Sequence, residues 1–243
     1  MGGVTAYILD TGILTTHEEL EGRAALGVKF VMSGPNVDDH GHVTHLAGLI
    51  GGKTYAVGKK VSLAGAKILS GTGSGITSDI IGARAIADKR GVNISLVGGK
   101  SKAINATVAR LYVKNASLFA TTSSSGDASI GSPSGGATTF AAGATDSNDA
   151  LPAYSAYGPC VEMFASGMGI KSAWIGSYGA TRTISGSPTS TALATGAVAL
   201  FVSQGGLSAA QAVYNKLLAE CTANVVTSQL GGANNYLLYN SGP

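Results

Sequence analysis

Short apolar segments alternate along the chain with longer segments of helical character. Apolar runs of strand length occur at residues 5–9, 63–69, 92–96, 117–121 and 138–143. Helical spacing or a longer apolar run occurs at 43–51, 78–89, 103–113, 188–202 and 208–219. Buried strands separated by helices are typical of parallel sheets. The pattern therefore predicts an α/β fold, a doubly wound, mostly parallel sheet with helices on both faces, in three layers.

No linker divides this alternation, so we expect one domain over residues 1–243, with the Gly- and Ser-rich residues 121–136 as a loop between two strands. Hydrophobic residues make up 44% and charged residues 12% of the chain, which is typical of a compact globular protein. The net charge of +3 comes from scattered side chains, so we expect no nucleic-acid partner. No apolar run approaches the ~18 residues of a membrane span, and no signal peptide is visible.

The first candidate for chemistry is Asp10, which follows the first predicted strand, together with the histidine-rich residues 38–45. Sites in parallel sheets form at the carboxyl ends of the strands, where Asp10 is expected to lie. A carboxylate that orients an imidazole, which then deprotonates a hydroxyl, is the arrangement of Ser-His-Asp catalysis. Asp10 and one of these histidines are therefore candidates for acid–base chemistry.

Two other kinds of site fit parts of the sequence. A zinc cluster would use Asp38, Asp39, His40, His42 and His45. A further ligand would have to come from His17, Cys160 or Cys221, and no spacing supports this. Residues 71–75 contain three glycines after a strand, but they lack the Lys-Ser/Thr pair of a phosphate-binding loop. We expect them to form an ordinary turn, and we expect free, buried thiols at both cysteines, although spacing alone leaves a disulfide open.

The aspartate and histidine segments resemble motifs of one known family. Residues 8–13 (ILDTGI) and 17–23 (HEELEGR) are similar to the aspartate segment of the subtilases, especially the proteinase K branch. Residues 41–48 (GHVTHLAG) resemble that family's GHGTHCAG motif, and further likeness extends from about Val4 to Asn240. The resemblance implies a subtilisin-like fold that lacks the segment preceding the aspartate strand in family members.

By position, the resemblance implies that Asp10 is the orienting carboxylate and His42 the general base. His45 would be a structural member of the same helix, and His17 a surface residue. Val43 replaces the family's glycine after the base, and its β-branched side chain is expected to add bulk beside the imidazole.

Two further positions bear on substrate binding. The family's substrate-binding strand corresponds to Ser95, Leu96, Val97 and Gly98. Val97 replaces a glycine there and is expected to crowd an extended peptide. The family's oxyanion asparagine corresponds to Ser123. Loss of such a donor typically costs ~10²–10³ in turnover.

The nucleophile position depends on the alignment register. An ungapped register from Ile184 to Gly196 places Pro188 on the family's serine. Proline has no hydroxyl, so it cannot be a nucleophile, but it suits the first turn of a helix. A second register, which needs compensating gaps, makes Ser190 the nucleophile. We favour Pro188 because it needs fewer gaps, and Ser190 remains the alternative.

These positions imply a subtilisin-like serine peptidase homologue that is inactive or severely impaired and has an unknown protein partner. The alternative is an active serine endopeptidase that uses Asp10, His42 and Ser190 on peptide or protein substrates. Glu162 lies where relatives bind calcium with an aspartate, but calcium takes six to eight oxygens, so we expect a solvated charge and no required cofactor. The resemblance implies a secreted protein, and we expect a monomer without a membrane partner.

Overall fold

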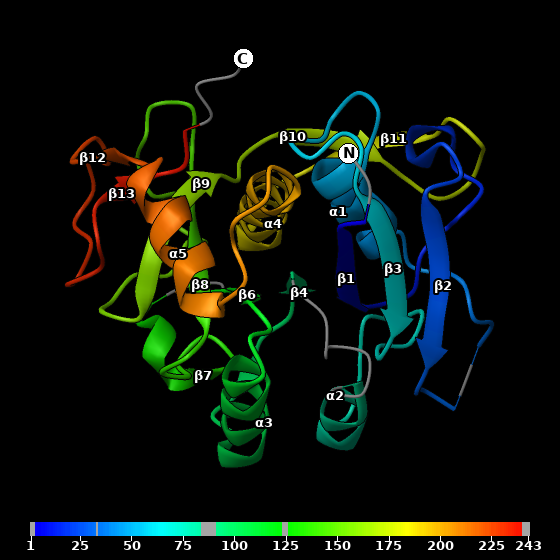
Figure 1. The fold of residues 1–243 in the computed structure, drawn as a ribbon, viewed down its shortest axis with the longest axis horizontal. Helices are drawn as coiled ribbons and strands as arrows, with labels where there is room; N and C mark the ends of the chain where they lie inside the picture. The colour runs from blue at the N-terminus through cyan, green and yellow to red at the C-terminus, as the bar shows by residue number, and fades with distance from the viewer. Residues whose placement is uncertain (1–2, 33, 84–90, 123–125, 240–243) are drawn as a thin grey trace.

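The computed structural model describes residues 3–32, 34–83, 91–122 and 126–239 (Figure 1). Within these residues, nine strands form one sheet. Their order across the sheet is β12 (Thr222–Ala223), β13 (Tyr236–Leu237), β9 (Val161–Ser166), β8 (Phe140–Thr145), β6 (Leu118–Thr121), β4 (Val92–Ile94), β1 (Thr5–Asp10), β3 (Ser62–Lys67) and β2 (Ala24–Lys29). All described neighbours are parallel except β12 and β13, so the predicted mostly parallel α/β sheet is confirmed.

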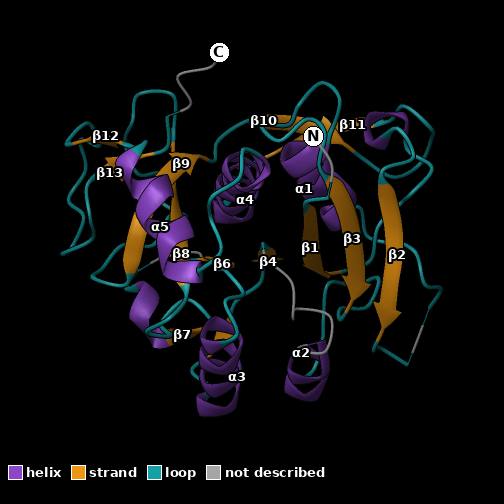
Figure 2. Cartoon of the chain, viewed as in Figure 1, coloured by secondary structure: helices purple, strands orange, loops and turns teal. Residues whose placement is uncertain are grey.

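Helices cover both faces of this sheet (Figures 1 and 2). The helices α1 (His42–Gly51), α4 (Ser187–Ser203) and α5 (Ala210–Ala219) lie on one face, and α2 (Thr77–Gly82) and α3 (Lys102–Val113) on the other. Strand β1 illustrates why both faces are covered. Successive side chains of a strand point to opposite faces of the sheet, so each face needs a packing partner. Ala6 and Ile8 pack with α1 and α4, whereas Tyr7 and Leu9 belong to the core cluster that includes α3. The predicted three layers are present.

Shorter elements lie around the sheet. Two two-stranded ribbons are formed by β5 (Gly98–Gly99) with β7 (Gly131–Ser132) and by β10 (Ile170–Ala173) with β11 (Thr181–Ile184). Among the described residues, the 3₁₀ helices η1 (Glu18–Leu20) and η3 (Ala128–Ile130) complete the order. The prediction of a plain loop at 121–136 is therefore wrong in part, because η3 and β7 lie inside it.

The sequence-based boundaries agree closely for the elements that position the site. Strand β1 and helix α1 match the predictions to within one residue. Of the helix predicted at 78–89, α2 accounts for the beginning, and residues 84–90 lie outside the described residues. None of the helices in the described ranges has the length and apolar character needed to span a bilayer.

Candidate active site

Asp10 and His42 lie in direct contact at the carboxyl edge of the sheet. Asp10 is the last residue of β1 and is fully buried, and His42 is the first residue of α1. His42 Nδ1 lies 2.9 Å from Asp10 Oδ2. Burial disfavours the imidazolium, but the charge and hydrogen bond of Asp10, with the charge of Asp38, outweigh it and raise the pKa of His42 above its ordinary value. The structure thus brings together a carboxylate and the imidazole that it orients.

Asp38 fixes the position of this pair, a role that the sequence did not reveal. Its Oδ1 accepts hydrogen bonds from Thr11 Oγ1 (2.9 Å) and the Gly41 amide (2.8 Å). Its Oδ2 accepts from the amide (2.9 Å) and the hydroxyl (2.7 Å) of Thr44. The N-cap residue, Gly41, has no side chain to satisfy the first amides of α1, so Asp38 supplies the acceptor. One carboxylate therefore joins the residue after Asp10 to the turn that holds His42.

A buried lysine braces the same corner. Lys67, at the end of β3, is fully buried, and its Nζ lies 2.7 Å from the Thr11 carbonyl oxygen and 2.5 Å from Asp39 Oδ1. Asp38 and Asp39 are thus both engaged in structural contacts. Within the described ranges, no three His, Cys, Asp or Glu side chains are gathered so that they could hold a metal ion. The zinc interpretation gains no support from this arrangement.

The other two histidines of the motif segments are buried. His45 is fully buried, its Nε2 lies 3.1 Å from the Ile170 carbonyl oxygen, and burial lowers its pKa to about 4. This agrees with a structural role. The prediction that His17 lies at the surface is wrong, because only 1% of it is exposed. Its Nδ1 accepts from the Glu19 amide (3.1 Å), and its Nε2 donates to the Ala180 carbonyl (2.8 Å), so it caps η1 and ties it to the chain before β11.

The side chain of Val43 is packed into the core and does not stand free beside the imidazole. Its side chain is fully buried in the core cluster between α1 and the sheet, with Ile8 and Leu46 among its members. The β-branched residue therefore contributes to the packing of α1 against β1.

The beginning of α4 contains both candidates for the nucleophile position. Ser187 and Pro188 form its first turn, with Gly186 as the N-cap. Ser190 is fully buried, and its Oγ donates to the carbonyl of Ala165 at 2.9 Å, with the carbonyl of Ser166 at 3.2 Å. The described hydrogen bonds of Ser190 thus point to the end of β9.

Helix α4 runs antiparallel to the strands beneath it. Asn93, within β4, donates to Thr195 Oγ1 at 3.1 Å, whereas Ser95, beyond the carboxyl end of β4, lies 3.5 Å from the Pro188 carbonyl oxygen. The beginning of α4 therefore lies at the carboxyl edge of the sheet, and its later residues lie farther from that edge. Pro188 lies at the same edge as Asp10.

Helix α1 lies beside α4 (Figure 1), and its contacts indicate that it runs in the same direction. It begins at His42 against the end of β1, and a Cβ at Gly51 would lie 2.9 Å from Val61, at the opposite edge. A Cβ at Gly196 in α4 would lie 3.0 Å from the Ile50 carbonyl oxygen in α1. Since these positions are similarly far along their helices, the first turns of both helices lie toward the carboxyl edge of the sheet. Pro188 and His42 therefore share this edge.

A cavity of about 260 Å³ opens at the beginning of α4. It is lined by residues 95–97, 121–122, 185–188 and Tyr154. Three of the predicted substrate-binding residues, Ser95, Leu96 and Val97, therefore share one cavity with Pro188, and Gly98 pairs with β7 beside it. Ser123, the predicted oxyanion residue, lies outside the described residues.

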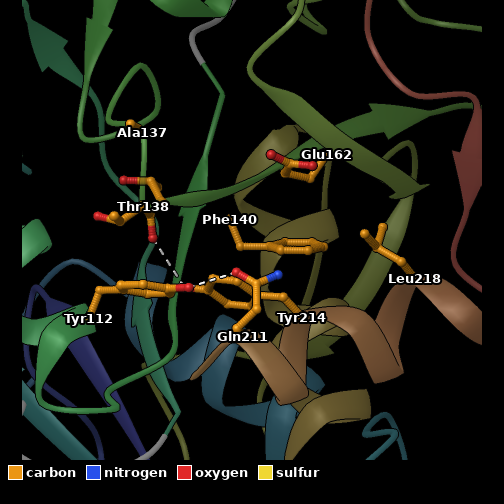
Figure 3. A pocket seen from close by; sticks show the side chains of 9 residues that line it. Tyr112, Ala137, Thr138, Phe140, Glu162, Gln211, Tyr214 and Leu218 are labelled. Carbon is orange, nitrogen blue, oxygen red and sulfur yellow. Dashed lines mark hydrogen bonds between the residues drawn. The ribbon is translucent and has the colours of Figure 1, made fainter. Parts of the chain in front are cut away.

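Glu162 lies in a separate cavity of about 130 Å³ (Figure 3). The cavity is also lined by Phe140, Tyr214 and Leu218, and one carboxylate oxygen of Glu162 accepts from Asn234 Nδ2 at 3.2 Å. Glu162 is half-buried, and this burial raises its pKa, so the side chain is more enclosed than the expected solvated charge. Glu162 is the one carboxylate among the residues that line this cavity, which also include Thr138, Thr139 and Gln211. A single carboxylate is weak support for a calcium site, because calcium takes six to eight oxygen ligands.

The two cysteines are free, but they are half-buried and not fully buried as expected. Cys221 Sγ donates to the Leu217 carbonyl at 3.3 Å. Burial raises the pKa of both thiols, that of Cys221 to about 11. Neither thiol has the lowered pKa of a reactive cysteine.

Comparison with known proteins places this chain in a family. Residues 2–232 match the model of the subtilase family, Peptidase S8. Subtilisin-like protease 2 of Pseudogymnoascus destructans is 36% identical, covering 96% of this chain and 60% of that protein. Alkaline serine protease ver112 of Corniculantispora psalliotae is 39% identical, covering 98% of this chain and 64% of that protein.

The fold comparison agrees. A crystal structure of a cold adapted subtilisin-like serine proteinase superposes with a TM-score of 0.92 at 34% identity, covering 99% of this chain and 90% of that one. The chain spans 60 to 64% of the length of the curated relatives named above. On the family match and these identities, the chain belongs to the subtilase family.

Proposed function

We propose that this subtilase homologue binds peptides without cleaving them, with residues 1–243 acting as one peptidase-fold domain. The observation that supports this most strongly is the first turn of α4, where Pro188 lines the cavity at the same edge of the sheet as the Asp10–His42 pair. Proline has no oxygen that could attack a peptide carbonyl, so no acyl-enzyme forms at this position. Loss of the serine nucleophile in a protease of this kind removes on the order of 10⁶ in turnover.

The alternative, an active endopeptidase using Asp10, His42 and Ser190, conflicts with helix geometry. Residues two apart on an α-helix point to nearly opposite sides. Pro188 lines the cavity at the edge of the sheet, and Ser190 donates to the carbonyls at the end of β9. Ser190 would have to leave these bonds, and α4 would have to rotate, before its hydroxyl could reach His42.

The remaining site favours binding over chemistry. The Asp10–His42 pair is intact, and the cavity beside Val97 is open enough to accept a side chain. The replacement of the oxyanion asparagine by Ser123 supports the loss of activity on sequence grounds alone. The ligand class, peptide or protein, follows from the family, and secretion and a monomeric state stay expectations.

Labelling with a fluorophosphonate probe tests the proposal, because the probe reacts only with an activated serine. We expect no labelling of the purified chain and no cleavage of a denatured protein substrate, alongside an active subtilase as positive control. Labelling that is abolished in Ser190→Ala would establish the alternative. Labelling that is abolished only in Ser187→Ala would show that the neighbouring hydroxyl has become the nucleophile, and it would also overturn the proposal.

A further inference from the structure

Two buried hydroxyls face the cavity at the beginning of α4 without a partner. Ser187 is 3% exposed and Thr122 is 2% exposed, and both line this cavity. Neither hydroxyl oxygen has a hydrogen-bond partner within the described part of the chain. Leaving a buried polar group unpaired costs free energy. A ligand that supplies hydrogen-bond acceptors here would remove that cost, since each hydroxyl can donate one hydrogen.

The first turn of α4 adds a favourable field for an anion. The helix has 17 residues and begins at Ser187, on the wall of the same cavity. Its first turn contains no acidic residue. The amino end of a long helix bears a partial positive charge, which stabilises anions placed against it. The cavity therefore combines hydroxyl donors with a positive helix end.

His42, at the same edge of the sheet, adds a positive charge when its imidazole is protonated. Its Nδ1 is held by Asp10, so its other ring nitrogen is left for a ligand, and the side chain is 20% exposed. Asp10 and Asp38 favour the imidazolium and raise the pKa of His42, against the effect of burial. The neighbouring imidazoles are His40, whose ring centroid lies 6.1 Å away, and the neutral, buried His45.

We propose that this site binds peptides by their carboxyl terminus, with the terminal carboxylate between His42 and the beginning of α4 and the last side chain in the adjoining cavity. The proposal rests on the proposed function, since an active protease would also accept internal peptide bonds. An uncleaved internal peptide presents a neutral amide at this point, whereas a chain end presents a full negative charge. The charged end is therefore the better match to an imidazolium and a helix amino end.

A matched pair of peptide mixtures tests the preference. We would use fluorescein-labelled octapeptides randomised at the last two positions, prepared once with a free carboxylate and once as carboxamides, and measure binding by fluorescence anisotropy. We expect the carboxylate mixture to bind at least tenfold more tightly. In His42→Gln this difference should disappear, whereas in the control His40→Gln it should remain. Above the raised pKa of His42, the affinity for the carboxylate mixture should fall, and that for the carboxamides should not.

Three outcomes would overturn the inference: equal affinity for the two mixtures, binding of neither, or an undiminished preference in His42→Gln. Circular dichroism of each variant checks that it is folded, and Asp10→Asn provides a second variant that weakens the imidazolium without removing the ring. Mass spectrometry of the same samples separates this test from the proposed function. Cleaved peptides would refute the non-catalytic function, whereas intact peptides bound equally would refute only the preference for a chain end.

Discussion

Ser190 Oγ donates to the Ala165 carbonyl across 2.9 Å, and this bond joins the first turns of α4 to the end of β9. The serine that a motif search would choose as nucleophile is therefore a structural tie in this protein. Ser190 is fully buried, and backbone carbonyl oxygens accept the hydrogen bond of its hydroxyl.

Replacing Ser190 with alanine should therefore affect stability and not reactivity. Loss of a buried hydrogen bond typically lowers the free energy of unfolding by about 1 kcal/mol. We expect urea unfolding to show this loss. Like the parent chain, the variant should remain unlabelled by the fluorophosphonate probe. Ser203→Ala is the control, since Ser203 Oγ bonds to the Leu200 carbonyl at the other end of α4, where a smaller loss is expected. Unchanged stability in Ser190→Ala would contradict the structural role.

Pro188→Ser should restore some reactivity, because it returns a hydroxyl to the first turn of α4, at the edge of the sheet where His42 lies. We expect slow fluorophosphonate labelling that is absent in the double variant Pro188→Ser/His42→Gln. Adding Ser123→Asn should raise the turnover of a peptide substrate by a further ~10²–10³, the usual contribution of an oxyanion donor. If Pro188→Ser stayed unlabelled while remaining folded, the assignment of the nucleophile position to residue 188 would be wrong.

Asp38→Ala should be strongly destabilising. The substitution leaves buried donors from Thr11, Gly41 and Thr44 without an acceptor. We expect the free energy of unfolding to fall by about 3 kcal/mol or more. Asp146→Ala is a matched control, because Asp146 also accepts two backbone hydrogen bonds, but in a turn near the surface. Equal losses in the two variants would show that Asp38 is only a local turn residue.

His45 should make the protein less stable in acid. Its pKa is lowered to about 4 in the folded chain and returns to about 6.5 on unfolding, so the unfolded state binds a proton that the native state excludes. Stability should therefore fall as pH decreases from about 6.5 to 4, by about 3 kcal/mol in total. His42 has the opposite sign, because its raised pKa stabilises the native state at low pH and loses this effect as pH rises. Urea unfolding of His45→Gln across this range should show a shallower slope, and an unchanged slope would refute the assignment.

The sequence predicted those features that depend on local pattern. An apolar run of strand length predicted β1, and the longer apolar segment at 43–51 predicted α1. The motifs that resemble the family assigned Asp10 and His42 as a pair, and the two side chains are in contact. The phase of α4 was not predictable, because the helix is apolar nearly all round and its periodicity gives no facing side. Only the contacts with β9 and β4 fix which residues face the cavity.

Long-range contacts account for what the sequence analysis missed. His17 is buried because it bonds to Ala180, a residue 163 positions away. Lys67 is buried because its amine donates hydrogen bonds to the Thr11 carbonyl and to Asp39, which come from two other segments. A polar side chain next to a turn is usually exposed, so no local signal distinguishes these residues from surface charges.

The surroundings of Trp174 have a practical consequence. It is the chain's single tryptophan, its ring lies edge-to-face with that of His45 at 6.2 Å, and the Arg182 guanidinium stands 4.5 Å from its centre. All indole emission of this protein thus arises at the helix that presents His42. When this tryptophan is excited selectively over the chain's nine tyrosines, its fluorescence would report on ligand arrival at that corner and on local loosening that precedes global denaturation.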